Sequence, residues 1–348
     1  MYADLRPRLE KSLRALEGYE GEGRIDYGDW NKFQTEFIDV LDKHGRLIDK
    51  NLQSFRGLSI GVWDEPRIPI RHYHIDHPLW RIFLLLVYTV WGSKRGTIRE
   101  AFEHFRVLED NGYLNLLAKY PSPDVGKPFN IRYRGYRFTN RYLRQIYLLG
   151  MFNEHVAPLL SAGPTILDIG CSYGLFSSLV KQEKPDSRHV LVDTPVPLLL
   201  AHYYLKTLFP DARIADFKDV AAVEKVDRKF IENYDFVLLP ASMYEKLTSG
   251  AIDLVTNFVS FAEMSREWFT KYFDSAPVRS APFLFTVNRY DSHPTYSNKI
   301  TVLDYPFDRY ETIYMRTCPI LLWRFEGYSF FLCRKVRLPS ELFQFVGR

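Results

Sequence analysis

The chain has 348 residues, of which 46% are hydrophobic and 25% charged, and its formal net charge is +4. This is an ordinary composition for a soluble globular protein, and the length allows one large core or two modest ones. The chain has three cysteines, too few for a disulfide framework and without the spacing of zinc ligands, which favours a reducing, cytoplasmic location. The sequence contains no run of five Lys or Arg residues, so it does not indicate a nucleic-acid partner.

Residues 1–137 are expected to form a mainly helical N-terminal region. The first residues are charged and lack the apolar core of a signal sequence. The longest apolar run, residues 82–91, is about half as long as a membrane span, so it predicts a buried helix, with a membrane-interface segment as the alternative. Apolar residues at helical spacing predict helices over residues 6–18, 30–47, 78–90 and 98–117. Turn-forming residues predict short alternating runs over residues 57–77 and a loop or hairpin over residues 120–137.

A long helix over residues 138–160 is expected to lead into a region where short apolar runs alternate with helical patterns. Strands are predicted over Thr165–Ile169, residues 190–193, Phe236–Pro240, residues 252–258 and residues 283–288. The helices between them are predicted over residues 175–181, Pro195–Leu208, residues 242–248 and residues 262–275. This alternation predicts an α/β fold, a mostly parallel, Rossmann-like sheet with helices on both faces. Two late strands, near residues 311–316 and 328–335, would close the sheet.

The turn after the first of these strands lies in TILDIGCSYGLF, residues 165–176, which is the most informative segment of the chain. Asp168, Gly170 and Gly174 mark a strand, a tight turn and a helix start. The glycines let the chain turn sharply and let a ligand approach the backbone, while the helix N-terminus offers free N–H groups. Ser172 stands where a dinucleotide-binding fingerprint has its second glycine. The alternative is an ordinary strand–turn–helix without a ligand.

The second strand also ends in an acid, Asp193, about 20 residues beyond the glycine turn. A carboxylate at this position can accept hydrogen bonds from both ribose hydroxyls of an adenosyl ligand. The alternative is that Asp193 caps the helix that begins near Pro195, and both roles can hold together.

Four stretches resemble the bacterial sugar O-methyltransferases, a branch of the class I S-adenosylmethionine-dependent methyltransferase superfamily. They are TILDIGCSYG at residues 165–174, LLLAHYYL at residues 198–205, IDLVTNFVSFAEM at residues 252–264 and VNRY at residues 287–290. The resemblance covers about residues 138–335, and residues 260–264 are its more selective part. It implies a methyltransferase sheet, S-adenosylmethionine as cofactor and a sugar or glycan hydroxyl as methyl acceptor. Ser172 departs from the family, where many relatives have glycine.

A sugar hydroxyl is a poor nucleophile at neutral pH, so its methylation needs a base or a metal. Glu263 follows the fourth strand and His293 lies in the loop after the fifth, both at the carboxyl edge where such sheets place their sites. They are the candidate bases; Glu263 as a helix cap and His293 in a surface turn are the alternatives. The acceptor is expected to contact Asn288 and Arg289. Contacts with the cofactor are predicted for Asp168, Gly170, Cys171, Gly174, Asp193 and Asn257. For Asn257 the alternative is that it only satisfies the polar groups at the end of its strand.

A histidine-rich segment and Cys171 are not predicted to be a metal site or a nucleophile. Residues 71–77, RHYHIDH, place His72 and His74 on one face if the segment is extended, but no complementary carboxylate pair stands out in the C-terminal half. A polar strand and turn, or a lip of the acceptor site, is therefore preferred, and no metal site is predicted. Cys171 is expected to be a small filler beside the cofactor, because nothing places a base next to its thiol.

The sequence thus predicts two parts, residues 1–137 as a helical cover on the acceptor side and residues 138–348 as a Rossmann-like S-adenosylmethionine-binding domain. Three functions remain open. The first is O-methylation of a sugar or glycan, and the second is methylation of a small molecule or lipid held against residues 82–91. The third is a non-catalytic Rossmann-like module that binds a nucleotide or a protein partner. No membrane span is expected, and the oligomeric state is left open, a homo-oligomer included.

Overall fold

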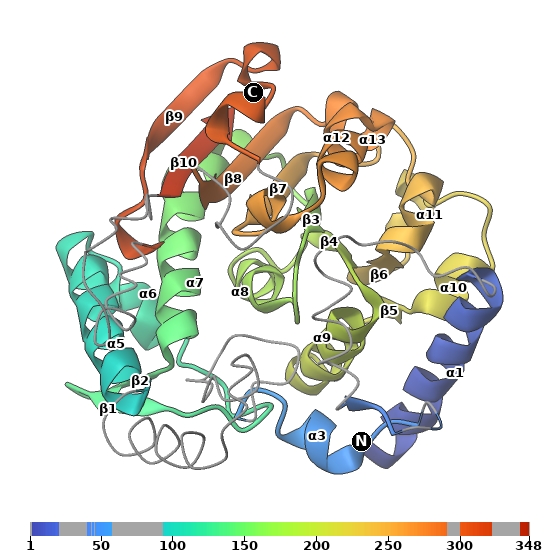
Figure 1. The fold of residues 1–348 in the computed structure, drawn as a ribbon, viewed down its shortest axis with the longest axis horizontal. Coiled ribbons are helices and arrows are strands. Elements are labelled where there is room, and N and C mark those ends of the chain that lie inside the picture. The colour runs from blue at the N-terminus through green and yellow to red at the C-terminus, as the bar shows by residue number, and fades with distance from the viewer. Residues whose placement is uncertain are drawn as a thin grey trace, which may run out of the picture.

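The centre of the molecule is a sheet with helices on both faces (Figure 1). The computed structural model describes residues 2–20, 40–42, 44, 46–57, 93–290, 300–321 and 342–347. In these residues the sheet has eight strands in the order β5-β6-β4-β3-β7-β8-β10-β9. This arrangement confirms the predicted α/β, Rossmann-like class. No helix among the described residues combines the length and the apolar character needed to cross a membrane.

Six neighbouring strands of the sheet run parallel. They are β3 (Thr165–Ile169), β4 (Arg188–Asp193), β5 (Ile214–Ala215), β6 (Phe236–Pro240), β7 (Leu254–Phe258) and β8 (Phe283–Arg289). Most of their residues are buried, because helices cover both faces, and this explains the continuous apolar runs that predicted them. The five predicted strands are confirmed. The sixth, β5, was not predicted, since two residues are too short to give a pattern.

The last two strands close the sheet with a reversal of direction. Strand β10 (Leu342–Gly347) lies antiparallel between β8 and β9 (Thr312–Thr317). The strand predicted near residues 311–316 is therefore confirmed. The one predicted at residues 328–335 lies outside the described residues, and β10 was missed because its pattern is short and ends in glycine.

Helices α7, α8 and α9 cover one face of the sheet, and α10 to α13 cover the other (Figure 1). Their bounds are α7 (Asn140–Met151), α8 (Leu175–Glu183), α9 (Pro195–Leu208), α10 (Phe217–Ala221), α11 (Arg228–Ile231), α12 (Arg266–Asp274) and α13 (Ala276–Ser280). The predicted helix over residues 138–160 is α7 continued by a π-helix, Phe152–Val156, and a 3₁₀ turn, Ala157–Leu159. The helix predicted at residues 242–248 is a 3₁₀ helix, Ala241–Lys246.

The described part of the N-terminal region is mostly helical. It contains α1 (Tyr2–Glu20), α3 (Asp49–Gln53), α5 (Ser93–Asp110), α6 (Leu114–Lys119) and the hairpin of β1 (Ile131–Tyr133) with β2 (Tyr136–Phe138). Two predictions here were wrong in part. The helix over residues 98–117 is broken at Gly112, whose φ is +75°. The end of the helix over residues 30–47 is instead a bridge between Leu41 and Leu47. The predicted elements at residues 58–77 and 78–90 lie outside the described residues.

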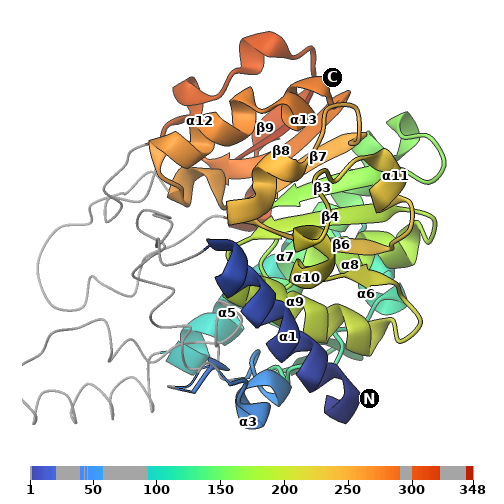
Figure 2. The same ribbon diagram turned by 90° about the vertical axis from the view of Figure 1, so that its right-hand side faces the viewer.

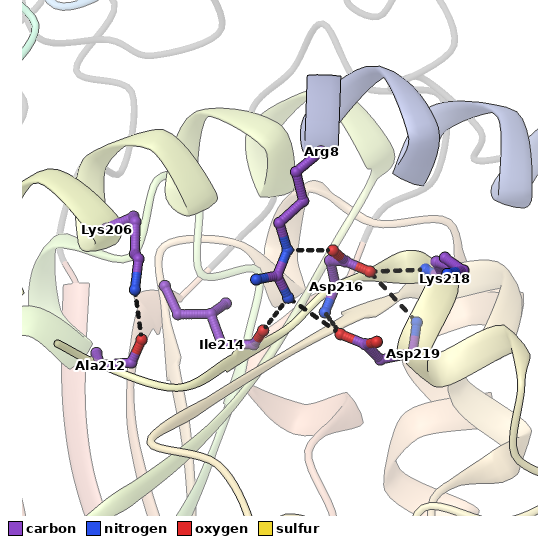
Figure 3. Close-up of polar contacts among 7 residues, drawn as sticks. All are labelled: Arg8, Lys206, Ala212, Ile214, Asp216, Lys218 and Asp219. Atoms are coloured by element: carbon purple, nitrogen blue, oxygen red, sulfur yellow. Dashed lines mark hydrogen bonds and ion pairs between the residues drawn. The ribbon is translucent and has the colours of Figure 1, made fainter. Parts of the chain in front are cut away.

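Helix α1 lies at the β5 edge of the sheet, against α9 and α10 (Figure 2), and one arginine fastens it there (Figure 3). Arg8 Nε donates to Asp216 Oδ2 at 2.7 Å, and its Nη2 donates to the Ile214 carbonyl at 2.9 Å. Asp216 also caps α10 by accepting the N–H groups of Lys218 and Asp219. Burial would raise the pKa of Asp216, but the hydrogen bond and charge of Arg8 outweigh it and lower that pKa.

Candidate functional site

The glycine turn joins β3 to α8 through three residues in the left-handed region. Gly170, Ser172 and Gly174 have φ angles of +72°, +53° and +75°. Glycine adopts this conformation without a steric penalty, whereas a residue with a side chain, such as Ser172, is held there at a cost of about 1 kcal/mol. The turn is therefore a fixed shape that its surroundings impose.

Most backbone donors of the turn are already used inside the protein. Four of the five N–H groups of residues 170–174 donate to protein acceptors. The bonds run from Gly170 to Val192 O at 2.8 Å, from Cys171 to Val192 O at 3.3 Å, from Gly174 to Cys171 O at 3.0 Å and from Ser172 to Asp193 Oδ2 at 2.7 Å. These bonds tie the turn to the end of β4 and leave it few N–H groups for an anionic ligand.

Gly170 is required by the protein itself. A Cβ atom at this position would lie 2.1 Å from Ser260 Oγ, and the φ of +72° disfavours any side chain. At Gly174 a Cβ would lie 3.3 Å from Leu205 Cδ1, which is tight but not a collision. The glycine at position 170 thus allows β3 and the residues after β7 to approach closely, whichever ligand the turn binds.

Asp193 ends β4 and turns its carboxylate toward the glycine turn. Oδ2 accepts the Ser172 N–H, and Oδ1 accepts the Thr194 N–H at 2.7 Å. The N-cap of α9 is Thr194, so Asp193 does not cap that helix by bonding its first turn. Burial raises the pKa of Asp193 to about 6, although these hydrogen bonds and the charge of Arg141 act to lower it. Oδ1 also accepts the Thr194 hydroxyl at 3.4 Å, whereas Oδ2 keeps a lone pair that can accept a ligand hydroxyl.

Asp168 lies inside the sheet, beneath the turn rather than at its surface. Its side chain is buried and accepts hydrogen bonds from the hydroxyls of Ser177 and Thr256, both at 3.0 Å. Burial raises its pKa to about 7, and the nearby charge of Asp193 adds to this. Asp168 therefore links β3 to α8 and β7, and it reaches a ligand through its charge more readily than through a direct hydrogen bond.

Asn257, near the end of β7, uses its side-chain amide in hydrogen bonds within the protein. Its Nδ2 donates to the Ile169 carbonyl at 2.7 Å and to Ser260 Oγ at 2.6 Å. Its Oδ1 accepts from Phe261 N–H at 3.2 Å and from Asn288 Nδ2 at 2.8 Å. These bonds hold the ends of β3, β7 and β8 in register, which is the strand-end role for Asn257; its contact with the cofactor and that of Asn288 with the acceptor stay predictions.

The structure describes only one of the two candidate bases, Glu263. Glu263 ends a 3₁₀ turn, Phe261–Glu263, just after β7, and its carboxylate lies 3.4 Å from the Arg289 guanidinium. Both side chains are largely buried. This contact places the Glu263 carboxylate beside a cation at the carboxyl edge of the sheet. His293 lies outside the described residues, and its role stays a prediction.

Cys171 is a buried thiol within the turn, and its Sγ donates to the Ser172 carbonyl at 3.4 Å. Burial raises its pKa well above the usual value, and the charges of Asp193 and Asp168 act in the same direction. A thiol in this setting is inert, which fits the predicted role of a filler. Within the described residues no cluster of His, Cys, Asp and Glu could hold a metal ion, and His72 and His74 lie outside them.

Sequence reasoning missed the residues that surround the turn from the N-terminal side. Tyr173 is fully buried, and the ring of Phe55 meets it edge-on with centroids 5.3 Å apart. The guanidinium of Arg141, at the start of α7, lies 5.3 Å from the centre of the Tyr173 ring, and that of Arg56 lies 5.7 Å from it. These contacts join residues far apart in the chain, so no local pattern could have indicated them.

No protein-family model and no curated protein matches the chain. A candidate sarcosine dimethylglycine methyltransferase from Galdieria sulphuraria aligns with 61% of this chain and 88% of its own, at 9% identity and a TM-score of 0.42. Geranyl diphosphate methyltransferase in complex with SAM aligns with 60% of this chain and 87% of its own, at 11% identity and a TM-score of 0.39. Coclaurine N-methyltransferase bound to N-methylheliamine and SAH aligns with 91% of this chain and 74% of its own, at 10% identity and a TM-score of 0.37. Identities and TM-scores this low assign neither a family nor a substrate.

Proposed function

We propose that this chain is a class I S-adenosylmethionine-dependent methyltransferase. The observation that carries the proposal is the 2.7 Å hydrogen bond between Ser172 N–H and Asp193. It brings together the glycine turn after β3 and the acid at the end of β4, at the carboxyl edge where open α/β sheets bind their ligands. A ribose held by the remaining lone pair of Asp193 Oδ2 would place the rest of an adenosyl ligand along the turn.

The electrostatics of the turn favour a cationic ligand over a dinucleotide. A pyrophosphate needs several free N–H groups, and residues 170–174 have committed four of theirs to protein acceptors. Two acids, Asp168 and Asp193, lie beside the turn and would repel phosphate. A sulfonium cofactor requires no phosphate cradle and gains from both carboxylates.

The acceptor in this proposal is a sugar or glycan hydroxyl. The support is the resemblance of residues 138–335 to the bacterial sugar O-methyltransferases, together with the 16% aromatic content, since aromatic rings suit sugar faces. The cofactor supplies an electrophilic methyl group. The chain has to align the acceptor oxygen with that group and remove the hydroxyl proton, and Glu263 or His293 would take this proton.

Titration of the whole chain with S-adenosylmethionine and S-adenosylhomocysteine by calorimetry tests the cofactor. The expected result is binding of both, weakened in Asp193→Asn and unchanged in Asp211→Asn, whose side chain is exposed at the surface. Binding of NADH in preference to both would contradict the proposal, and so would equal affinity in the two variants.

A second experiment identifies the acceptor class. The chain and methyl-labelled cofactor are incubated with free sugars, nucleotide sugars, glycans and lipids, and the products are read by mass spectrometry. A mass gain of one methyl group on a sugar is expected. Methylation of lipids alone would replace the sugar with the lipid alternative, and cofactor binding without transfer to any acceptor would favour the non-catalytic module.

A further inference from the structure

One cation beside the glycine turn forms no ion pair with a described residue. Arg141 is the second residue of α7 and is partly buried, with its guanidinium against the Tyr173 ring. It forms no ion pair or hydrogen bond with a described residue, in contrast to Arg144 one turn later, which pairs with Glu100. Contact with the Tyr173 ring and the charge of Asp193, which is not at ion-pair distance, offset part of the desolvation of this guanidinium.

The position of Arg141 is set by the turn itself. Tyr173 is fully buried between Phe55 and Tyr204, whose rings lie 5.3 and 4.9 Å away, so the surface on which Arg141 rests is rigid. The charge of Arg141 also acts on Asp193, where it lowers the pKa against the effect of burial. Arg141 therefore lies against a residue of the turn and within electrostatic range of Asp193.

The neighbouring arginine is not available for a ligand. Arg56 is fully buried, and its Nη1 and Nη2 donate to the carbonyls of Pro123 and Val125 and to the hydroxyl of Ser122. It closes the loop before the β1–β2 hairpin onto Tyr173. Arg141, the other described cation against the Tyr173 ring, has no such carbonyl or hydroxyl partner among the described residues.

We infer that Arg141 binds the α-carboxylate of the amino-acid part of the cofactor, an inference that rests on the proposed function. S-adenosylmethionine carries one carboxylate, at the end opposite to its adenine. With the ribose on Asp193 and the chain of the ligand over the turn, Arg141 supplies a planar pair of donors that a carboxylate can accept. The ammonium and sulfonium groups then remain near the acids, and each charge of the ligand meets its opposite.

The test compares two ligands that differ only in this end. S-adenosylhomocysteine has the carboxylate, and 5′-methylthioadenosine keeps the adenosine and the sulfur but lacks the amino-acid end. Calorimetry is run with the full chain and the variants Arg141→Met, Arg141→Lys and Arg106→Met, the last of which removes an exposed charge on α5. Thermal unfolding by circular dichroism checks that each variant is folded.

In Arg141→Met, affinity for S-adenosylhomocysteine should fall about 10- to 100-fold, the range for hydrogen bonds to a charged group, while affinity for methylthioadenosine stays within about twofold. Arg141→Lys should recover part of the loss, and Arg106→Met should bind both ligands normally. An equal loss for both ligands, or no loss for either, would overturn the inference. If the unmodified chain binds neither ligand, the proposed function itself fails, which is a distinct result.

Discussion

Asp168 is expected to destabilise the protein at neutral pH, and its replacement by asparagine should reveal this. Burial raises its pKa to about 7, against about 4 for an aspartate in water. A tenfold change in an equilibrium corresponds to about 1.4 kcal/mol, so this difference is worth at most about 4 kcal/mol of unfolding free energy. Because the folded state holds the proton more tightly than the unfolded state, stability from this group falls as pH rises from about 4 to about 7.

The surroundings of Asp168 can accept an asparagine. Its Oδ1 would accept from Ser177 Oγ as the carboxylate does, and its Nδ2 would donate to Thr256 Oγ1. The Thr256 hydroxyl lies 3.4 Å from the Leu167 carbonyl and can turn its proton there. Asp168→Asn should therefore keep its hydrogen bonds while it removes a buried charge, and at pH 8 the ligand-free variant should be more stable by about 2 to 4 kcal/mol.

Urea unfolding followed by circular dichroism at pH 4, 6 and 8 measures this difference. The gain of the variant should be small at pH 4 and largest at pH 8. A matched control is Asp235→Asn, because the pair with Lys181 at 2.8 Å lowers the pKa of Asp235 despite its burial, so this variant should lose stability at pH 8. The reasoning is refuted if Asp168→Asn is less stable than the unmodified chain at pH 8, or if the difference does not depend on pH.

Four other predictions follow from the site and the fold. Asp193→Asn should weaken S-adenosylhomocysteine binding by about 1.5–3 kcal/mol in calorimetry, and an unchanged affinity in a folded variant would exclude the ribose contact. Because the pKa of Asp193 is about 6, affinity for S-adenosylmethionine should fall about tenfold from pH 7.5 to pH 5, and a rise on acidification would contradict the role of a charged acid. Whichever of Glu263→Gln and His293→Ala removes the base should lower turnover at saturating cofactor by about 10²–10⁴-fold and leave cofactor affinity unchanged, whereas full activity in both would place the base elsewhere. Arg8→Ala should reduce unfolding free energy by about 1 kcal/mol at neutral pH, since Arg8 is half exposed, and this loss should fade below about pH 4 as Asp216 becomes protonated; a loss that persists there would point to packing instead.

The parallel core could be predicted because its signals are local. A strand buried on both faces is a continuous apolar run, so Thr165–Ile169 and Phe236–Pro240 were predicted with the bounds that the structure has. A proline is common in the first turn of a helix, and the helix predicted over Pro195–Leu208 also has the bounds that the structure shows. Elements without such a signal were missed: β5 has two residues, and Gly112 breaks a helix whose apolar spacing continues on both sides.

The candidate site was predicted less well, because sequence position does not tell which partner a polar group meets. The ends of the strands correctly brought Asp193 and the glycine turn together, but nothing in the sequence distinguishes Asp193, which faces the turn, from Asp168, which is buried under it. Asn257 was expected at the cofactor, yet its amide is used by Ile169 and Ser260. Contacts such as that of Arg141 with Tyr173 cross 32 residues (141 to 173) and depend on packing alone.

The site residues divide by how many of their bonds the protein itself uses. Gly170, Asn257 and Asp168 make their contacts within the fold. Asp193 and Arg141 are the opposite case: Asp193 Oδ2 keeps a lone pair, and Arg141 forms no ion pair with a described residue. This leaves one carboxylate and one cation that a ligand can meet. A zwitterionic ligand with an added positive charge, which is what S-adenosylmethionine is, complements both at once.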